Sequence, residues 1–265
     1  MTAPRLVATD LDGTLLDPSG RVSARTRAVL DELDARDVPV VFTTGRPVRW
    51  MVDLWDAVGG HGLAICSNGG IVYDVAARAV RDFSAVPREV GMELAARVRE
   101  AVPGTTLAVE HTSGWASEDG FPTHPDDRDS EQGTWESIWR DDVVKVLAVH
   151  RDLEAEDFWK RVDDAVGDLV TTTWSSAFAL VEISAAGVTK ATTLDSLATE
   201  MGVSAAEVVA FGDMPNDLPM LEWAGTSYAM ANAHPSVLDL ADHVAPGNDE
   251  DGVAAVLAEL FSLSG

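Results

Sequence analysis

The feature that most constrains this chain is a short apolar run that ends in two aspartates, RLVATDLDGTLLD at residues 5–17. Residues 6–8 are continuously apolar, which is typical of a strand buried on both faces of a parallel sheet. Gly13 marks where the strand pattern stops. Asp10 and Asp12 stand two positions apart, so at a strand end their side chains would project to the same side and repel each other unless a cation holds them.

Two interpretations of this D-x-D-G sequence are open. A divalent cation such as Mg²⁺ prefers hard oxygen ligands, few protein carboxylates and a share of water and phosphate oxygens. One aspartate is then a candidate nucleophile and the other a candidate proton carrier. Asp and Gly are also ordinary turn residues after a strand, so the tripeptide alone does not distinguish a metal site from a turn.

The size and charge of the chain limit how many domains it can form and which kinds of partner it can bind. At 265 residues it exceeds the common domain size, so we expect either two domains or one domain with an insertion, and a 46% hydrophobic content can build a sizeable core. The formal net charge is -25, from 44 acidic and 19 basic residues. This charge argues against nucleic-acid and membrane partners. A small anionic substrate would need a compact cationic or metal site.

The sequence has few features that point to export or to a membrane. Cys66 is the single cysteine, so no internal disulfide can form, and no apolar leader segment precedes Asp10. No apolar run reaches the length of a membrane span. We therefore expect a cytoplasmic protein, while the oligomeric state is left open.

Strand and helix patterns alternate at both ends of the chain, which predicts a parallel α/β sheet. Ser23 is a candidate helix cap, and Pro47 a candidate first helical residue. Further strands are expected at 38–43, 63–66, 71–73, 208–211 and 227–230, and helices are expected to begin near residues 23, 47, 189, 218 and 253.

The middle of the chain has a different pattern, with runs of strands and two helices, which predicts an α+β insertion. Strands are expected at 105–110, 143–149, 169–173 and 178–183, and helices from residue 87 and at 154–166. An acidic loop at 117–133 separates two of these strands. With His111, the loop residues His124, Asp126, Asp127 and Asp129 could bind a metal, but a solvated loop is the favoured interpretation.

Polar residues recur where strands end. They are Asp10 and Asp12, then Thr44, Gly45 and Arg46, then Lys190 at a helix start, and then Asp213, Asn216 and Asp217. In open α/β sheets, ligands bind outside the carboxyl ends of the strands, so these groups could meet in one crevice. Asp213 would add a carboxylate for Mg²⁺, while Lys190 and the Thr44 hydroxyl would hold the oxygens of a transferring phosphoryl group.

The motifs DLDGTLL, TTGR, the lysine of GVTK, and GDMPND resemble, in order and spacing, those of the haloacid dehalogenase (HAD) superfamily, and its Cof-type, sugar-phosphatase-like branch in particular. The resemblance covers nearly the whole chain. It implies a Rossmann-like, parallel-sheet catalytic core from residues 1–82 and 187–265, with an α+β cap at 83–186 that sets substrate specificity. Thr44 and Lys190 are 146 positions apart, against 34 between Asp10 and Thr44, which places the cap between the second and third motifs.

The resemblance also implies roles for single residues. Asp10 would attack phosphorus to form an aspartyl-phosphate, and Asp12 would protonate the leaving alcohol and later activate water. Thr44 and Lys190 would bind the phosphoryl group. The implied Mg²⁺ ligands are Asp10, the backbone carbonyl of Asp12, and Asp213. Asn216 would lie near the phosphate, and Asp217 would lie behind the ligands. Ala191 departs from the family pattern, in which glycine often follows the lysine.

Two residues near these motifs are ambiguous. Gly45 allows a close backbone approach to an anion, while Arg46 could contact substrate or pair with an acidic neighbour. Asn68 is interpreted as a turn or cap residue, although its loop could line the crevice.

The expected function is a Mg²⁺-dependent phosphatase that hydrolyses a small phosphorylated metabolite, a sugar phosphate by class, through an aspartyl-phosphate. A phosphomutase or phosphotransferase acting on a sugar phosphate is the alternative within the enzymes. A non-catalytic phospho-aspartate signalling module is the alternative outside them.

Overall fold

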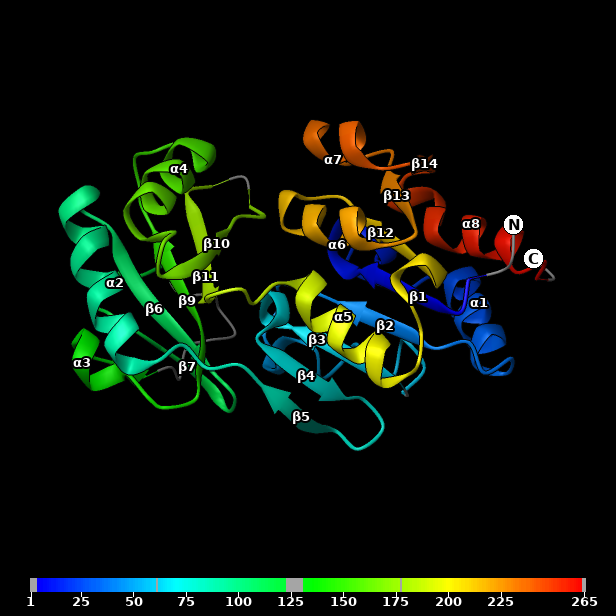
Figure 1. The fold of residues 1–265 in the computed structure, drawn as a ribbon, viewed down its shortest axis with the longest axis horizontal. Helices are drawn as coiled ribbons and strands as arrows, with labels where there is room; N and C mark the ends of the chain where they lie inside the picture. The colour runs from blue at the N-terminus through cyan, green and yellow to red at the C-terminus, as the bar shows by residue number, and fades with distance from the viewer. Residues whose placement is uncertain (1–3, 61, 123–130, 177, 264–265) are drawn as a thin grey trace. The chain divides into compact units, whose positions relative to one another are not determined.

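The computed structural model describes residues 4–60, 62–122, 131–176 and 178–263. The chain forms two compact units, the first made of Met1–Arg81 with Lys190–Gly265 and the second of Asp82–Thr189 (Figure 1). The sequence placed these boundaries after residues 82 and 186, one and three residues away. The first unit is therefore discontinuous in sequence, and the second is inserted into it.

The first unit is built on an eight-stranded sheet with the order β14-β13-β12-β1-β2-β3-β4-β5 (Figure 1). Neighbouring strands from β14 to β3 are parallel, whereas β4 is antiparallel to β3. The strands are β1 Leu6–Asp10, β2 Val40–Thr43, β3 Leu63–Cys66, β4 Ile71–Asp74, β5 Ala79–Phe83, β12 Val208–Gly212, β13 Thr226–Met230 and β14 His243–Ala245. This arrangement confirms the predicted α/β class with a parallel-strand core.

Strand β1 lies in the middle of the sheet because its side chains can be buried on both faces. All five of its residues are buried, and it pairs with β12 on one side and β2 on the other. Val7 lies opposite Val209 and Val40 in these two ladders. A central, fully buried strand holds its carboxyl end rigidly, and that end is Asp10.

Five helices accompany this sheet among the described residues. They are α1 Ala24–Asp34, α5 Lys190–Glu200, α6 Leu218–Trp223, α7 Pro235–Leu240 and α8 Gly252–Leu260. Helix α1 begins as predicted, with the Ser23 side chain accepting a hydrogen bond from the backbone N–H of Thr26. Helices α1 and α8 contact each other, as do α5 and α6.

The helix predicted after Pro47 is not a regular helix. A single turn of 3₁₀-helix, Val48–Trp50, is followed by irregular turns. The segment is rich in β-branched and aromatic residues, which are mediocre helix formers, and Gly59 and Gly60 at its end both have positive φ. Its apolar character still anchors it, because Trp55 is buried and stacks on Tyr73 with ring centroids 5.2 Å apart.

The second unit is a six-stranded sheet with the order β10-β11-β9-β6-β7-β8, packed against helices. Its strands are β6 Thr106–His111, β7 Gly114–Ser117, β8 Glu131–Gln132, β9 Val143–Val149, β10 Val170–Thr173 and β11 Leu180–Ala185, and its helices are α2 Arg88–Ala101, α3 Trp135–Ile138 and α4 Ala155–Val166. One face of the sheet joins α2 and α4 in a continuous apolar core. The sequence did not predict β7, β8 or α3 of this unit, or β5, α7 and β14 of the first, all of which are six residues long or shorter.

The acidic loop is only partly described. The predicted candidates His124, Asp126, Asp127 and Asp129 lie outside the described residues. His111 ends β6 and is buried. None of the helices in the described ranges is both long and apolar enough to span a bilayer.

Candidate active site

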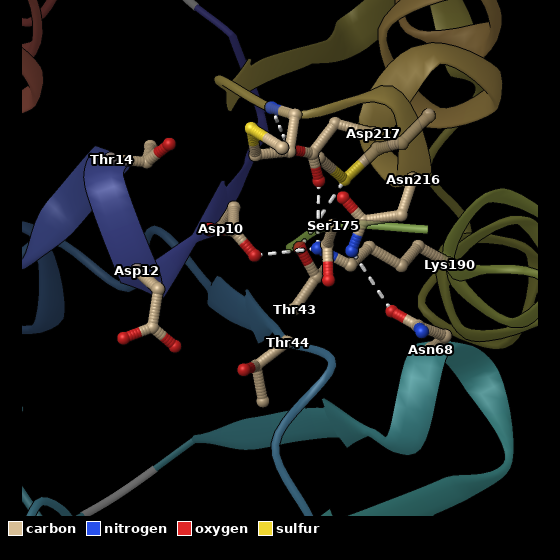
Figure 2. Close-up of polar contacts among 12 residues, drawn as sticks. Asp10, Asp12, Thr14, Thr43, Thr44, Asn68, Ser175, Lys190, Asn216 and Asp217 are labelled. Atoms are coloured by element: carbon tan, nitrogen blue, oxygen red, sulfur yellow. Dashed lines mark hydrogen bonds and ion pairs between the residues drawn. The ribbon is translucent and has the colours of Figure 1, made fainter. Parts of the chain in front are cut away.

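Figure 2 shows five of the predicted site residues close together at the carboxyl edge of the parallel sheet of the first unit: Asp10, Thr44, Lys190, Asn216 and Asp217. Strand β1 ends at Asp10, directly opposite Thr43 at the end of β2, and β12 ends at Gly212, one residue before Asp213. Because these three strands are neighbours and parallel, their carboxyl ends lie at one edge. Helix α5 adds Lys190 as its first residue.

A buried ion-pair cluster lies at the centre of this edge. The Nζ atom of Lys190 donates to Oδ1 of Asp10 at 2.5 Å and to Oδ1 of Asp217 at 2.7 Å, and all three side chains are buried (Figure 2). Burial opposes the charged form of Lys190, but the two carboxylates outweigh it and raise the pKa of the lysine. Burial, together with Asp217 and Asp213, raises the pKa of Asp10 well above its ordinary value despite the lysine.

Asp213 is the third carboxylate of the cluster. Its Oδ1 accepts a hydrogen bond from the Thr14 hydroxyl at 2.8 Å. Burial and the neighbouring Asp217 raise the pKa of Asp213 to about 7, against the lowering effect of Thr14. Among the described residues, ligand oxygens of Asp10, Asp213 and Asp217 lie within 4.8 Å of one another, close enough to share a metal ion.

Gly13 makes room for Asp213. Its φ is +75°, and a Cβ at this position would lie 2.2 Å from Oδ2 of Asp213. Both the backbone conformation and the close approach therefore require glycine. From the sequence, Gly13 is expected only to end the strand. The tertiary structure shows that it also leaves space for the carboxylate of Asp213, 200 positions away.

Asp12 does not point the same way as Asp10. Figure 2 shows its carboxylate directed away from the Asp10–Lys190 pair, and its side chain is 54% exposed. The guanidinium of Arg46 holds it through two hydrogen bonds, from Nε to Oδ2 at 2.7 Å and from an Nη to Oδ1 at 2.5 Å. The same-side expectation was wrong because β1 ends at Asp10 and the chain turns at Leu11–Leu15, so strand alternation does not extend to Asp12.

The loop after β2 presents Thr44, Gly45 and Arg46. Thr44 is buried, its backbone N–H donates to the carbonyl of Ile65 at 2.8 Å, and its hydroxyl oxygen accepts from the backbone N–H of Arg46 at 3.0 Å. These contacts fix the Thr44 hydroxyl at the same strand edge as Asp10 (Figure 2). Of the two interpretations of Arg46, the structure shows pairing with an acidic neighbour, Asp12.

The loop after β12 is organised by Asp217. Its Oδ2 accepts from the backbone N–H groups of Asp213 at 3.0 Å and Met214 at 3.1 Å, so it fixes the loop that carries the third carboxylate. Asn216 donates from Nδ2 to Oδ1 of Asn68 at 3.0 Å. Asn68 lies in a turn, as the sequence favoured, and its side chain also belongs to this cluster. The signal that could have found it was its place in a Ser-Asn-Gly-Gly run directly after a strand.

The donor set fits a hard divalent cation. Among the described residues, the carboxylates of Asp10, Asp12, Asp213 and Asp217 meet two paired cationic side chains, Lys190 and Arg46, so the ionised cluster is negative overall. All of its candidate ligand atoms are oxygens, which Mg²⁺ prefers. The pKa values of Asp10 and Asp213 are raised first by burial and then by the neighbouring carboxylates.

The fold and the site together define an α/β enzyme with an acidic, lysine-containing centre at the carboxyl edge of a parallel sheet. Comparison with known families makes this assignment specific. The model of the haloacid dehalogenase-like hydrolase family matches residues 7–257. The chain therefore belongs to the haloacid dehalogenase-like hydrolases, and it is a phosphatase of that family.

Several proteins similar to this chain are phosphatases. Phosphoglycolate phosphatase of Natronomonas pharaonis is 32% identical, with 97% of each chain covered. A 5-amino-6-(5-phospho-D-ribitylamino)uracil phosphatase of Bacillus subtilis, YcsE, is 27% identical over 96% of this chain and 94% of its own. The structure of the HAD phosphatase BT1666 from Bacteroides thetaiotaomicron superposes with a TM-score of 0.82 at 24% identity, covering 98% of this chain and 96% of that one. At this level of identity, the similarity to BT1666 shows a shared fold.

Proposed function

We propose that this protein is a Mg²⁺-dependent phosphatase that hydrolyses a small phosphorylated metabolite, a sugar phosphate by class, through an aspartyl-phosphate on Asp10. The observation that carries the proposal is the buried Asp10 carboxylate, held at 2.5 Å by the Lys190 ammonium at the carboxyl end of the central strand. A carboxylate fixed in this way has one oxygen bound to the lysine, and we assign the attack on phosphorus to its second oxygen.

The reaction divides into two displacements. In the first, Asp12 has left Arg46 and taken up a proton from solvent; an Asp10 oxygen bonds to phosphorus while the bond to the ester oxygen breaks, and Asp12 gives that proton to the leaving alcohol. In the second, water gives a proton to Asp12 and attacks phosphorus, which releases phosphate and restores Asp10. Lys190 and Thr44 hold the phosphoryl oxygens as charge redistributes over them.

Asp12 must leave Arg46 to act in this way. The bidentate ion pair keeps the Asp12 carboxylate turned away from Asp10. We infer that this ion pair represents a resting arrangement and that substrate binding releases the carboxylate toward the leaving oxygen. Arg46 would then be freed to contact the substrate, so that pairing and substrate contact would be successive states of one side chain.

Asp10 and Asp213, with the backbone carbonyl of Asp12, would hold Mg²⁺, which when bound neutralises charge on the phosphoryl oxygens. We assign Asp217 to a supporting role outside the metal ligands, because its oxygens already accept hydrogen bonds from Lys190 and from two backbone N–H groups. Its proposed task is to orient Lys190 and the loop that carries Asp213.

The substrate is proposed by class. The two similar enzymes named above act on phosphoglycolate and on a phosphorylated ribitylaminouracil, which share a phosphate monoester and differ in the alcohol. This pattern supports a small phosphorylated metabolite. The inserted unit, Asp82–Thr189, is the proposed source of selectivity for the alcohol.

The test is phosphate release by the purified protein with Mg²⁺ from p-nitrophenyl phosphate and from a panel of phosphorylated sugars, nucleotides and cofactors. We expect turnover that Asp10→Asn abolishes, because the neutral amide cannot form the acyl phosphate. No release from any member of the panel would refute the proposal. Conversion of a sugar phosphate into an isomer without net phosphate release would identify a phosphomutase instead.

A further inference from the structure

The turn that carries Asp12 and Gly13 has an irregular backbone. Within Leu11–Leu15, Asp12 has φ -74° and ψ 123°, and Gly13 has φ 75° and ψ -3°, neither of which is helical. The backbone N–H of Leu16 closes the turn by donating to the carbonyl of Leu11 at 2.9 Å. Carbonyl groups inside an irregular turn need hydrogen-bond partners from elsewhere. The shape of this turn therefore depends on contacts with other elements.

Two asparagines from the last part of the chain supply such contacts. Asn232, in the loop after β13, donates from Nδ2 to the carbonyl of Gly13 at 2.8 Å. Asn248 donates from Nδ2 to the carbonyl of Leu16, also at 2.8 Å. The backbone N–H of Asn248 donates to Oδ1 of Asn232 at 3.0 Å. Because a backbone N–H can only donate, this contact fixes the Asn232 amide with its N–H group toward Gly13.

The loop that holds Asn232 also holds the loop of the third carboxylate. The backbone N–H of His234 donates to the carbonyl of Asp213 at 2.8 Å. Strand β12, which leads to Asp213, lies between β13 and β1 in the sheet. Residues 231–234, which we call the β13 loop, therefore extend past the end of β12 to the turn that follows β1. Through Asn232 and His234 this loop contacts both of the loops that carry candidate metal ligands.

The two loops meet where there is little space between them. A Cβ on Gly13 would lie 2.2 Å from Oδ2 of Asp213, and the Thr14 hydroxyl donates to Oδ1 of Asp213 at 2.8 Å. The carbonyl of Asp12 belongs to the planar peptide that enters Gly13. A shift of Gly13 would therefore change the separation between the Asp12 carbonyl and the Asp213 carboxylate.

We propose that Asn232 is a positioning residue, which sets the separation between the Asp12–Gly13 turn and the Asp213 carboxylate and thereby tunes the affinity of the site for Mg²⁺. The inference rests on the proposed function, in which the Asp12 carbonyl and Asp213 are ligands, and deepens it. Asn232 acts through the backbone of Gly13 rather than by touching metal or substrate. Because Mg²⁺ requires near-ideal octahedral geometry, a small displacement of one ligand lowers affinity.

The chain offers a matched pair of variants. Asn232→Ala removes the donor to Gly13, and because Asn232 is exposed, the substitution leaves the core intact. Asn248→Ala is the control. It removes a hydrogen bond of the same length to the same stretch of chain, at Leu16, and it keeps the backbone N–H that Asn248 donates to Asn232.

The measurement is calorimetric titration of Mg²⁺ into the free protein, without substrate. Loss of one hydrogen bond predicts an increase of roughly 3- to 10-fold in the dissociation constant for Asn232→Ala. This is less than the 10- to 100-fold typical of losing a direct partner of a metal ligand, because Asn232 bonds the residue next to the ligand. Asn248→Ala should stay within about 2-fold of wild type. Thermal unfolding of both variants without metal is measured in parallel, and we expect similar, small losses of stability.

A second readout is the Mg²⁺ concentration that half-activates p-nitrophenyl phosphate hydrolysis, which should rise in Asn232→Ala by the same factor as the dissociation constant. Unchanged Mg²⁺ affinity in Asn232→Ala would overturn the positioning role and leave the phosphatase assignment intact. Equal weakening in Asn248→Ala would also overturn it, by showing that the general stability of the turn is responsible.

The titration separates this proposal from the proposed function. If the wild type binds Mg²⁺ but hydrolyses nothing, comparison of the two asparagine variants still decides the role of Asn232. If the wild type binds no Mg²⁺, the positioning role is rejected, whereas phosphate release from the substrate panel remains the test of phosphatase activity.

Discussion

Gly13 shows how one residue without a side chain can decide the geometry of a charged site. It adopts a left-handed backbone conformation, and its missing Cβ leaves the space that Oδ2 of Asp213 occupies. Any other residue there would face a backbone penalty of about 1–3 kcal/mol and would push the carboxylate away from Thr14 and Asp10.

The close approach of Gly13 to Asp213 can be tested by a single substitution. Gly13→Ala should lower kcat/KM for p-nitrophenyl phosphate by about 100-fold or more, the range for losing one preorganised polar group. Gly20→Ala is the matched control, because Gly20 has the same φ of +75° but a Cβ added there would meet nothing within 4 Å. Both variants share the backbone penalty, and only the first displaces Asp213. Similar activity losses in the two would show that backbone strain alone is responsible.

At the scale of single elements, helix α2 of the inserted unit depends on close packing at Gly91. A Cβ there would lie 1.9 Å from the ring of Trp139, which is buried and packs edge-on against Trp135 at 5.2 Å. The Trp135 indole N–H donates to the carbonyl of Gly91 at 3.1 Å. Helix α2 and the short helix α3 are therefore joined at one point where the backbone approaches two indole rings.

Gly91→Ala has two opposing effects on the free energy of unfolding. Their relative sizes decide whether the variant is more or less stable than the wild type. Alanine favours helix by about 1 kcal/mol over glycine, while overpacking a well-filled core destabilises by about 1–3 kcal/mol. Because the rigid Trp139 ring cannot shift without disturbing Trp135, we expect net destabilisation in urea unfolding. Glu89→Ala, at an exposed position of the same helix, should change stability by less than about 0.5 kcal/mol. A stabilised Gly91→Ala variant would contradict the packing described here.

At the scale of the whole molecule, the excess of negative charge affects function most directly at the candidate active site. A chain with a net charge of -25 gathers four carboxylates and two cations at one sheet edge. Such a cluster repels a phosphate ester until a metal cation changes the local field. Binding of Mg²⁺ should therefore also stabilise the fold, because the carboxylates converge only in the folded state.

We expect Mg²⁺ to raise the free energy of unfolding by about 2.7 kcal/mol when present at 100 times its dissociation constant, and EDTA to reverse the effect. Asp213→Asn should abolish this stabilisation while remaining folded. The pKa of Asp213 is raised to about 7, so the metal-free site holds a proton below that pH, and metal binding must displace it. Stabilisation by Mg²⁺ should then be smaller at about pH 6 than at about pH 8. Thermal shift measurements with and without the metal test this, and equal shifts in wild type and Asp213→Asn would contradict it.

The sequence by itself determined the elements that local chemistry controls. Continuous apolar runs predicted β1, β3 and β12, because a strand buried on both faces has no polar side to display. Ser23 predicted the start of α1, and the intervals between the motifs predicted an insertion between Thr44 and Lys190, the interval that contains the second unit. The segment after Pro47 was harder, because its apolar spacing suits a helix while its residue types and paired glycines do not.

Only the tertiary structure decided which groups face one another. Asp12 turns away to Arg46, Asp217 divides its oxygens between Lys190 and the Asp213 loop, and Asn68 pairs with Asn216 across 148 positions. None of these contacts follows from local pattern, because each joins residues that are distant in sequence and each depends on where a turn ends. The opening stretch thus determined that Asp10 stands at the end of a buried strand, whereas packing between strand ends decided which partners hold it there.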